Sequence, residues 1–346
     1  MRDHWTLGCV VILFSAVMQA QLFSATPITD LGTGLYLNQY QGGLYENGTN
    51  VLPSDHLADG QALDPQIADG TPFVFLGIGM SDVENAFSTF LNTVEMTQNV
   101  NPNMTLVVGG QAGEDSCEWA YAEGTPAQNG CPLAPNSMLI NPYDGALVRL
   151  APPNCGKPRH QACFKESDVR VVLYYDADSC RVERCHGLPA TNADAITQEM
   201  YEGMMARAVH IRYPNALKLF IVSRQYGGYA TLKISPEPEA YENGFSAKWM
   251  IAAQINQLRT GVIDPVAGDL SYTAAPWVAW GAYTWASGET PRLDGLVWCQ
   301  GQTDDICNGE IDFQPDGTHL SKGAGLTKWA NLELAAFLQE PWFVTE

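Results

Sequence analysis

The sequence predicts an α/β fold, a three-layer α/β/α sandwich with a central, mostly parallel sheet. From about residue 72 onwards, short apolar runs alternate with segments of helical periodicity. These runs are continuously apolar, which is typical of strands covered on both faces. Such alternation of strands and helices indicates a parallel sheet with helices on both sides. The expected strands are 73–78, 105–108, 169–175 and 217–222, and the expected helices are about 82–97, 193–211, 244–259 and 323–339.

Local patterns support these elements in chain order. The strand 73–78 leads into the helix 82–97, on which Val83, Phe87, Phe90, Leu91 and Val94 share one face. The strand 105–108 ends in the glycine-rich run 109–113. The helix 244–259 is expected to stop at Gly261, because glycine is common just beyond a helix end.

The remaining segments fall outside this alternation. Residues 1–20 are predicted to be a signal peptide, because Arg2 precedes an apolar run of 13 residues that is too short to span a bilayer. Residues 21–346 are expected to form a single domain that opens with an irregular N-terminal wrap over 21–70. Residues 114–167 carry four cysteines and seven prolines, and we expect them to be a loop-like insertion.

Charge narrows the range of partners. The chain has a net charge of -20 and a pI near 4.5. Nucleic-acid binding is not expected, because a phosphate-binding protein needs a basic surface. Tight docking on an anionic membrane is not expected for the same reason. With a signal peptide and no later transmembrane segment, the chain is predicted to be secreted, either extracellular or periplasmic.

The cysteine count fits export. Eight cysteines remain once Cys9 leaves with the signal peptide, and an even number in an exported chain predicts disulfides. Sequence neighbours suggest four local pairs: Cys117 with Cys131, Cys155 with Cys163, Cys180 with Cys185, and Cys299 with Cys307. The alternative is a zinc site of Cys180, Cys185 and His186, although this spacing matches no common zinc finger. No metal or organic cofactor is expected.

Three side chains predict a hydrolytic site. Asp316 and His319 are three residues apart, so the carboxylate can hydrogen-bond to the imidazole. Such a pair holds the histidine in the tautomer that accepts a proton from a serine hydroxyl. Ser81 lies at a strand-to-helix turn, a common place to present a nucleophile. The structural alternatives are that Ser81 is a helix N-cap and that Asp316-Gly317 is an ordinary turn pair.

The expected topology brings further candidates to the same place. In an open α/β sheet, sites form beyond the carboxyl ends of the strands. Gly113 follows the second predicted strand, and Asp176 and Asp178 follow the third. These residues are therefore expected at the same sheet edge as Ser81.

These motifs resemble the sequence blocks of SGNH (GDSL-type) hydrolases, which have a flavodoxin-like fold. Gly79-Met-Ser81-Asp is similar to the first block, Gln111-Ala-Gly113 to the second, and Asp316-Gly-Thr-His319 to the last. The stretch 213–249, which includes the motifs 223–229 and 236–242, and the stretch 276–281 resemble poorly characterised exported members, so the likeness covers about 72–340. It implies that Ser81 is the nucleophile, His319 the general base and then acid, and Asp316 its orienting carboxylate.

The resemblance also implies an oxyanion hole. Its expected donors are the backbone N–H groups of Ser81 and Gly113. The third block of the family usually supplies an asparagine side chain, whereas this chain has Asp176 and Asp178 in that region. An ionised carboxylate would repel a developing oxyanion, so either these aspartates lie elsewhere or another donor, for which Gln111 is the candidate, takes the place of the asparagine.

Substrate contacts are predicted more weakly. Arg224 is a candidate for binding an anionic group, and Tyr226 and Trp280 are candidates for contacting the substrate. Trp280 belongs to an aromatic group that would stack on sugar rings, with Trp277, Tyr283, Trp285 and Trp298. The alternatives are core packing for the aromatics and structural ion pairs for the cations. In the latter case Arg224 and Lys248 would pair with Glu237, Glu239 and Glu242.

Together the residues and the resemblance predict a serine esterase that works through an acyl-serine intermediate. An acylated carbohydrate, such as an acetylated polysaccharide, is the expected substrate class, by analogy with the superfamily. A lipid or aryl esterase is the first alternative. A non-catalytic carbohydrate-binding protein with the same fold is the second.

Overall fold

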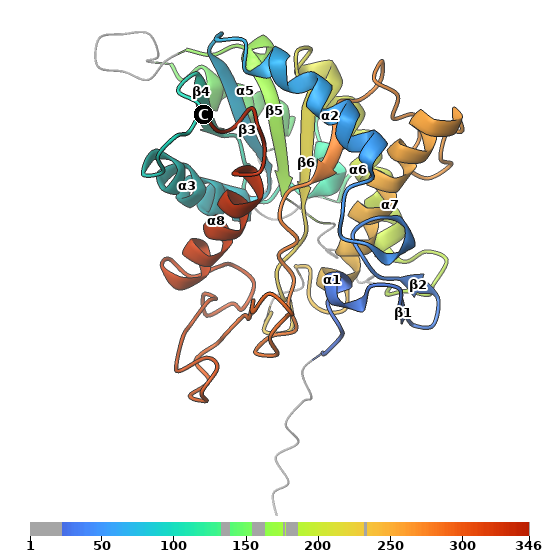
Figure 1. Cartoon of the computed structure of the whole chain (residues 1–346), viewed down its shortest axis with the longest axis vertical. Helices are drawn as coiled ribbons and strands as arrows, with labels where there is room; N and C mark the ends of the chain where they lie inside the picture. The colour runs from blue at the N-terminus through green and yellow to red at the C-terminus, as the bar shows by residue number, and fades with distance from the viewer. Residues whose placement is uncertain are drawn as a thin grey trace, which may run out of the picture.

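A five-stranded, all-parallel sheet lies at the centre of the structure (Figure 1). Its order is β4-β3-β5-β6-β7. The strands are β3 (Phe73–Gly79), β4 (Met104–Val108), β5 (Val169–Tyr175), β6 (Lys218–Val222) and β7 (Trp277–Trp280). This computed structural model describes residues 23–132, 139–153, 163–175, 177, 186–231 and 234–345.

Helices cover both faces of the sheet. On one face α3 (Ser81–Glu95) and α8 (Ala324–Phe337) lie side by side, and α2 (Ser54–Ile67) packs near β6 and β7 (Figure 1). The other face is covered by α5 (Pro142–Leu150), α6 (Asp194–Arg212) and α7 (Glu239–Thr260). The predicted three-layer α/β/α sandwich is therefore confirmed.

Aromatic side chains fill the space between the sheet and the α3–α8 layer. The Phe75 ring lies 5.5 Å from Phe87 on α3 and 4.9 Å from Phe337 on α8. Gly77 makes room for this packing, because a Cβ there would lie 2.6 Å from the Phe87 ring. Fully buried rings each remove a large apolar area from water, so this layer contributes strongly to folding.

The predicted boundaries agree well with the structure. Each of the four predicted strands matches within one residue at either end, and three of the four helices match within two. Helix α7 begins five residues before its predicted start, at Glu239, and ends at Gly261 in the left-handed conformation expected there. Strand β7 was not predicted, because its four residues are too few to show a periodicity.

The N-terminal wrap is more regular than predicted. Its described part contains α1 (Ile28–Leu31), the short pair β1 (Leu35–Tyr36) and β2 (Tyr40–Gln41), the turn η1 (Glu46–Gly48), and α2. The sequence hides α2 because its buried face consists of His56, Gly60, Asp64 and Ile67, of which only Ile67 is apolar. Gly60 packs against the Trp277 ring and Asp64 pairs with Lys218 at 2.5 Å, so tertiary contacts stabilise this helix.

The segment 114–167, predicted to be a loop-like insertion, contains short helices in its described part. Its described part contains α4 (Ser116–Trp119), α5 and most of η2 (Glu166–Asp168). Helix α5 lies in the connection from β4 to β5. Parallel strands need such a crossover, and a helix usually forms it. Asn141 caps it by accepting a hydrogen bond from the Tyr143 N–H, and Pro142 begins it. The many prolines and cysteines of the segment obscured this start signal.

Two of the predicted disulfides are confirmed. Cys117 is bonded to Cys131, and Cys299 is bonded to Cys307. Each bridge closes a short loop, as expected. The other two predicted pairings involve Cys155, Cys180 and Cys185, which lie outside the described residues, as does the predicted signal peptide. Within the described ranges, no helix has the length and apolar character needed to cross a membrane.

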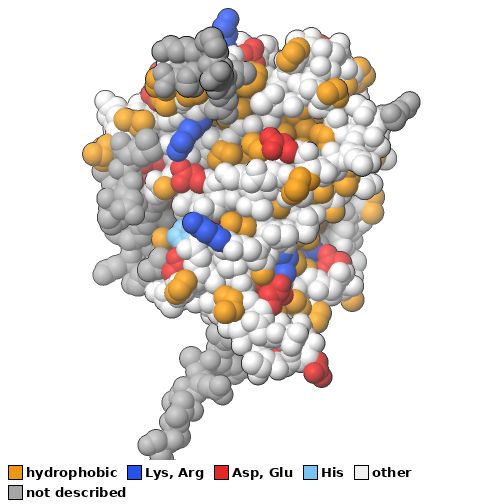
Figure 2. All heavy atoms as spheres, turned by 90° about the vertical axis from the view of Figure 1, so that its left-hand side faces the viewer, with side chains coloured by type: hydrophobic (Ala, Val, Ile, Leu, Met, Phe, Trp, Pro, Cys, Tyr) orange, Lys and Arg blue, Asp and Glu red, His pale blue; other side chains and the backbone are white. Residues whose placement is uncertain are grey.

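Acidic side chains are buried at several points. Burial raises the pKa of Glu199 to about 8 and that of Glu333 to about 8. Burial likewise raises the pKa of Glu237 to about 7, although three N–H donors oppose the shift. Surface charge, by contrast, is sparse on the side that carries α3 and β4, where hydrophobic and uncharged side chains are interspersed (Figure 2).

These raised pKa values predict that the protein is more stable in mild acid. A glutamate in the unfolded chain titrates near about 4.3, so the folded state binds more protons between that pH and about 8. The folded state therefore loses stability as the pH rises through this range. We expect the thermal midpoint to fall by several degrees between pH about 5 and about 8 at constant ionic strength. Glu199→Gln should reduce the fall, whereas Glu123→Gln at an exposed position should not. A midpoint that rises with pH would contradict this assignment.

Candidate active site

Ser81 is the first residue of α3 and directly follows the loop from β3. Its Oγ lies 2.9 Å from His319 Nε2, within hydrogen-bond distance. The N-cap of α3 is Met80, so the alternative role of Ser81 as an N-cap does not apply. A backbone N–H in the first turn has no acceptor within its own helix. The backbone N–H of Ser81 belongs to this first turn.

His319 is held by Asp316. The Asp316 Oδ2 atom lies 2.7 Å from His319 Nδ1, and Oδ1 accepts the backbone N–H groups of Thr318 and His319 at 2.9 and 3.0 Å. Partial burial acts to raise the pKa of Asp316, but these hydrogen bonds outweigh it and the pKa is lowered. An ionised Asp316 accepts a hydrogen bond from His319 Nδ1–H. The Nδ1 atom therefore keeps its proton, and the unprotonated Nε2 can accept the Ser81 proton. The His319 and Asp316 side chains are 22% and 26% exposed, so both remain accessible from solvent.

The turn that carries Asp316 and His319 packs tightly against the chain after β6. At Gly317, where φ is 67°, a Cβ would lie 1.8 Å from the Tyr229 carbonyl oxygen. The Thr231 backbone N–H also donates to the Asp316 carbonyl at 2.8 Å. Only glycine fits this conformation and this close approach, so Gly317 has a structural role here.

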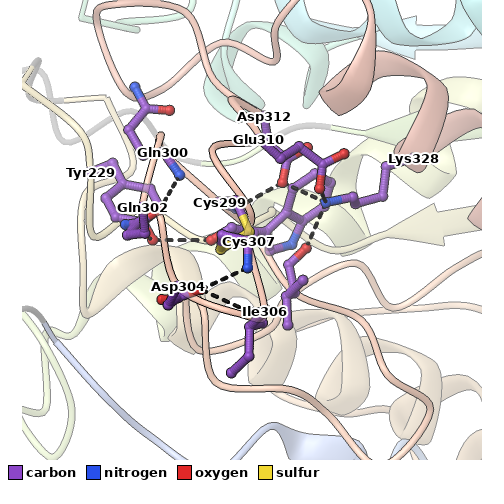
Figure 3. Close-up of a disulfide and its surroundings, with 12 residues drawn as sticks. Tyr229, Cys299, Gln300, Gln302, Asp304, Ile306, Cys307, Glu310, Asp312 and Lys328 are labelled. Carbon is purple, nitrogen blue, oxygen red and sulfur yellow. Dashed lines mark hydrogen bonds and ion pairs between the residues drawn. A yellow bond between two sulfur atoms is a disulfide. The ribbon is translucent and has the colours of Figure 1, made fainter.

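A disulfide lies beside the segment that leads into this turn (Figure 3). The Cys299 N–H donates to Asp312 Oδ2 at 2.7 Å, and Asp312 also pairs with Lys328 of α8 at 2.5 Å. The Cys307 N–H donates to Asp304 at 2.8 Å (Figure 3). Through Asp312, the segment immediately before Asp316 is therefore bonded both to the loop that begins at Cys299 and to helix α8.

Arg224, predicted as a substrate contact, forms a buried ion pair, which agrees with the structural alternative. Its guanidinium lies 2.6 Å from the carboxylate of Asp82, the residue after Ser81, and both side chains are almost fully buried. Its predicted glutamate partners were wrong. Lys248 likewise donates to the carbonyl oxygens of Gln41 and Gly42 instead of pairing with a glutamate.

The aromatic candidates belong to the core. Tyr226 is 2% exposed, and its hydroxyl donates to the Phe23 carbonyl at 2.7 Å. Trp280 is 7% exposed, and its indole N–H donates to the Leu44 carbonyl at 3.1 Å. The rest of the predicted group is buried as well, namely Trp277, Tyr283, Trp285 and Trp298. These side chains therefore do not form an exposed platform for sugar rings, and the core-packing alternative holds.

The second predicted block lies beyond β4, at the same sheet edge. Gln111 is 2% exposed, and its side-chain amide donates to the Gly109 carbonyl at 2.9 Å. Its Oε1 end faces Gly145 of α5, so this side chain is held within the fold. Gly113 follows with φ of 87°. Asp176 and Asp178, from the third block, lie outside the described residues.

The alternative zinc site involves Cys180 and Cys185, which lie outside the described residues. Among the residues that the structure describes, two groups have the proximity of metal ligands: Glu289, Asp304 and Cys307, and Cys299, Glu310 and Asp312. Each group relies on a cysteine of the Cys299–Cys307 bridge, and a disulfide sulfur does not provide the thiolate that a metal binds.

Comparison with known proteins finds no matching protein-family model and no matching curated protein. What can be said of this site therefore depends on its own geometry. Sequence reasoning identified Ser81, Asp316 and His319, but missed the loop after β6 as a support for them. Arg224 and Tyr226 of this loop were predicted as substrate contacts, and its supporting role was missed because its contacts are with residues far away in the chain.

Gly79 allows β3 to run close to β5 just before Ser81. Its φ is 137°, and a Cβ there would lie 2.2 Å from the Tyr175 carbonyl oxygen. Gly79→Ala is therefore expected to lower the free energy of unfolding by several kcal/mol. At Gly70, φ is 86° but a Cβ would meet nothing within 4 Å, so Gly70→Ala should cost only about 1 kcal/mol.

Chemical denaturation of both variants separates a backbone clash from a strained φ alone. Equal losses at the two positions would show that the close approach of β3 and β5 is not the cause.

Proposed function

We propose that this protein is a serine hydrolase that cleaves carboxylic esters through an acyl-serine intermediate. One observation carries the proposal. The hydroxyl of Ser81, the imidazole of His319 and the carboxylate of Asp316 form a continuous hydrogen-bonded chain, with distances of 2.9 and 2.7 Å. This order of groups is the arrangement that activates a serine nucleophile.

In the first half of the proposed reaction, Ser81 Oγ attacks the ester carbonyl carbon. His319 Nε2 takes the hydroxyl proton as the new C–O bond forms, and Asp316 stabilises the resulting imidazolium. The tetrahedral intermediate then collapses, the bond to the alcohol breaks, and His319 returns its proton to the leaving alkoxide. The acyl group remains on Ser81.

In the second half, water attacks the acyl-serine. His319 accepts a proton from this water and then gives it to Ser81 Oγ as the acid product leaves. Because the His319 and Asp316 side chains are partly exposed, water can reach them from solvent. The atoms therefore balance as ester plus water giving acid plus alcohol.

The oxyanion is proposed to be bound at the N-terminus of α3. The Ser81 N–H lacks an acceptor within its own helix, and the positive end of the helix dipole favours a negative charge there. Gly113 is the second proposed donor, by its position beyond β4 and the likeness of its block to SGNH hydrolases. Gln111 is not included, because its amide is bonded to Gly109.

The resemblance to SGNH hydrolases is part of this proposal, and the flavodoxin-like strand order supports it. Export also remains proposed, and two disulfides support it because such bonds persist in oxidising compartments. An acylated carbohydrate stays the proposed substrate class. This choice now depends on the resemblance and on export, since the aromatic residues once assigned to sugar stacking are buried.

Removing the nucleophile tests the proposal directly. Ser81→Ala should lower kcat for p-nitrophenyl acetate by at least about a thousandfold, and His319→Ala similarly. Asp316→Asn should lower it by roughly a thousandfold or more, because the imidazole loses its orienting acceptor. Ser88→Ala is the matched control, since Ser88 lies on the same helix and donates to Glu84. Equal activity in wild type and Ser81→Ala would remove Ser81 from the mechanism.

A substrate panel tests the class of ester. We expect kcat/KM for acetylated oligosaccharides to exceed that for long-chain p-nitrophenyl esters by at least about tenfold, as a substrate-shaped site would require. Preference for long acyl chains would instead indicate a lipid or aryl esterase. Binding of glycans without turnover of any ester would indicate a carbohydrate-binding protein.

A further inference from the structure

The loop after β6 contacts both halves of the Ser81–His319 pair. These two residues are 238 positions apart in the chain, so no local structure holds them in register. Arg224 and Gln225 are consecutive residues of this loop, and both are 2% exposed. Arg224 reaches the helix that begins with Ser81, through Asp82. Gln225 reaches the turn that carries His319.

The contact of Gln225 is with the backbone of that turn. Its Nε2 atom donates to the carbonyl oxygen of Thr318 at 2.7 Å. Thr318 directly precedes His319 and is 3% exposed, so this bond is shielded from water. A buried hydrogen bond of this kind fixes the position of its acceptor, because breaking it leaves two polar groups unsatisfied.

The orientation of the Gln225 amide is itself fixed. The hydroxyl of Tyr175, the last residue of β5, donates to Gln225 Oε1. Since Oε1 accepts from Tyr175, the amide nitrogen is directed towards Thr318. The Tyr175 ring is fully buried and stacks on Trp329 of α8 at 5.1 Å. The turn is therefore tied through one side chain to the central sheet.

We propose that Gln225 is a positioning residue for the hydrolytic site. It holds the Thr318 carbonyl so that the His319 imidazole stays within hydrogen-bond distance of Ser81, and Arg224 supports the serine side through Asp82. This inference rests on the proposed serine-hydrolase function. Gln225 touches neither the substrate nor the reacting atoms, and its effect passes through the backbone of the turn.

The test compares two equally buried glutamines. Gln225→Met removes both hydrogen bonds of the side-chain amide and keeps the side-chain volume nearly constant. Gln254→Met is the matched control, because Gln254 is fully buried and donates to the carbonyl oxygens of Leu270 and Pro276 away from the site. Both variants should lose thermal stability. Only Gln225→Met should lower kcat for p-nitrophenyl acetate, by roughly 10- to 100-fold with KM within about twofold, since a small misplacement of a catalytic group has this effect.

A second readout does not depend on turnover. In proton NMR spectra, the proton shared by His319 Nδ1 and Asp316 is expected as a resonance far downfield, absent from His319→Ala. It should be retained in Gln254→Met and shifted or lost to exchange in Gln225→Met. If Gln225→Met does not fold, Tyr175→Phe gives the same comparison, because it removes only the hydroxyl that orients the amide.

The outcomes separate the two ideas. Wild-type protein that turned over no ester would overturn the proposed function, while the resonance would still report whether Gln225 positions His319. The positioning role alone would be overturned if the wild type is active and folded Gln225→Met has the kcat and the resonance of the wild type. Where Tyr175→Phe replaces Gln225→Met, the same result in Tyr175→Phe would overturn it. A kcat loss of equal size in Gln254→Met would likewise overturn it, because the effect would then follow from lost stability.

Discussion

The hydrogen bond between Ser81 and His319 requires that two distant parts of the chain are held at a fixed distance. It joins the start of α3 to the turn that precedes α8. These helices lie side by side on the same face of the sheet, and the chain enters both from the same sheet edge (Figure 1). The aromatic layer between them and β3 fixes their spacing. Packing that is far from the site therefore sets the distance between its two halves, because rigid elements carry each residue to its place.

Sequence reasoning succeeded where the signal is local. Asp316 and His319 are three residues apart, so their contact could be inferred from spacing alone, and it is present at 2.7 Å. The central strands were predicted because a strand buried on both faces is apolar at every position. It failed at α2, whose buried face is largely polar or glycine and makes sense only once Trp277 and Lys218 lie against it. Tertiary contacts that compensate for an unsuitable local pattern cannot be read from that pattern.

The candidate substrate residues show a different limit. Arg224 and the aromatic residues near the last blocks have side chains suited to binding, but the same side chains also suit a buried ion pair and an aromatic core. Composition does not distinguish the two uses, because both require an apolar surrounding and a few fixed hydrogen bonds. Burial decides between them, and here it assigns Arg224 to Asp82 and Trp280 to the core.

Asp316 at the site and the buried glutamates Glu199 and Glu333 have pKa shifts in opposite directions. The chain has 38 acidic and 18 basic residues, so many carboxylates have no cation to pair with. Burial raises the pKa of Glu199 and that of Glu333, because it removes the charged form from water. Asp316 has a lowered pKa instead, because hydrogen bonds from the backbone N–H groups of Thr318 and His319 and from the His319 imidazole outweigh the effect of its burial. All of these donors belong to its own turn, so the charge of this carboxylate depends on the shape of that turn. The bonds that Thr231 and Gln225 make to the turn would then support both the position of His319 and the charge of the carboxylate beside it.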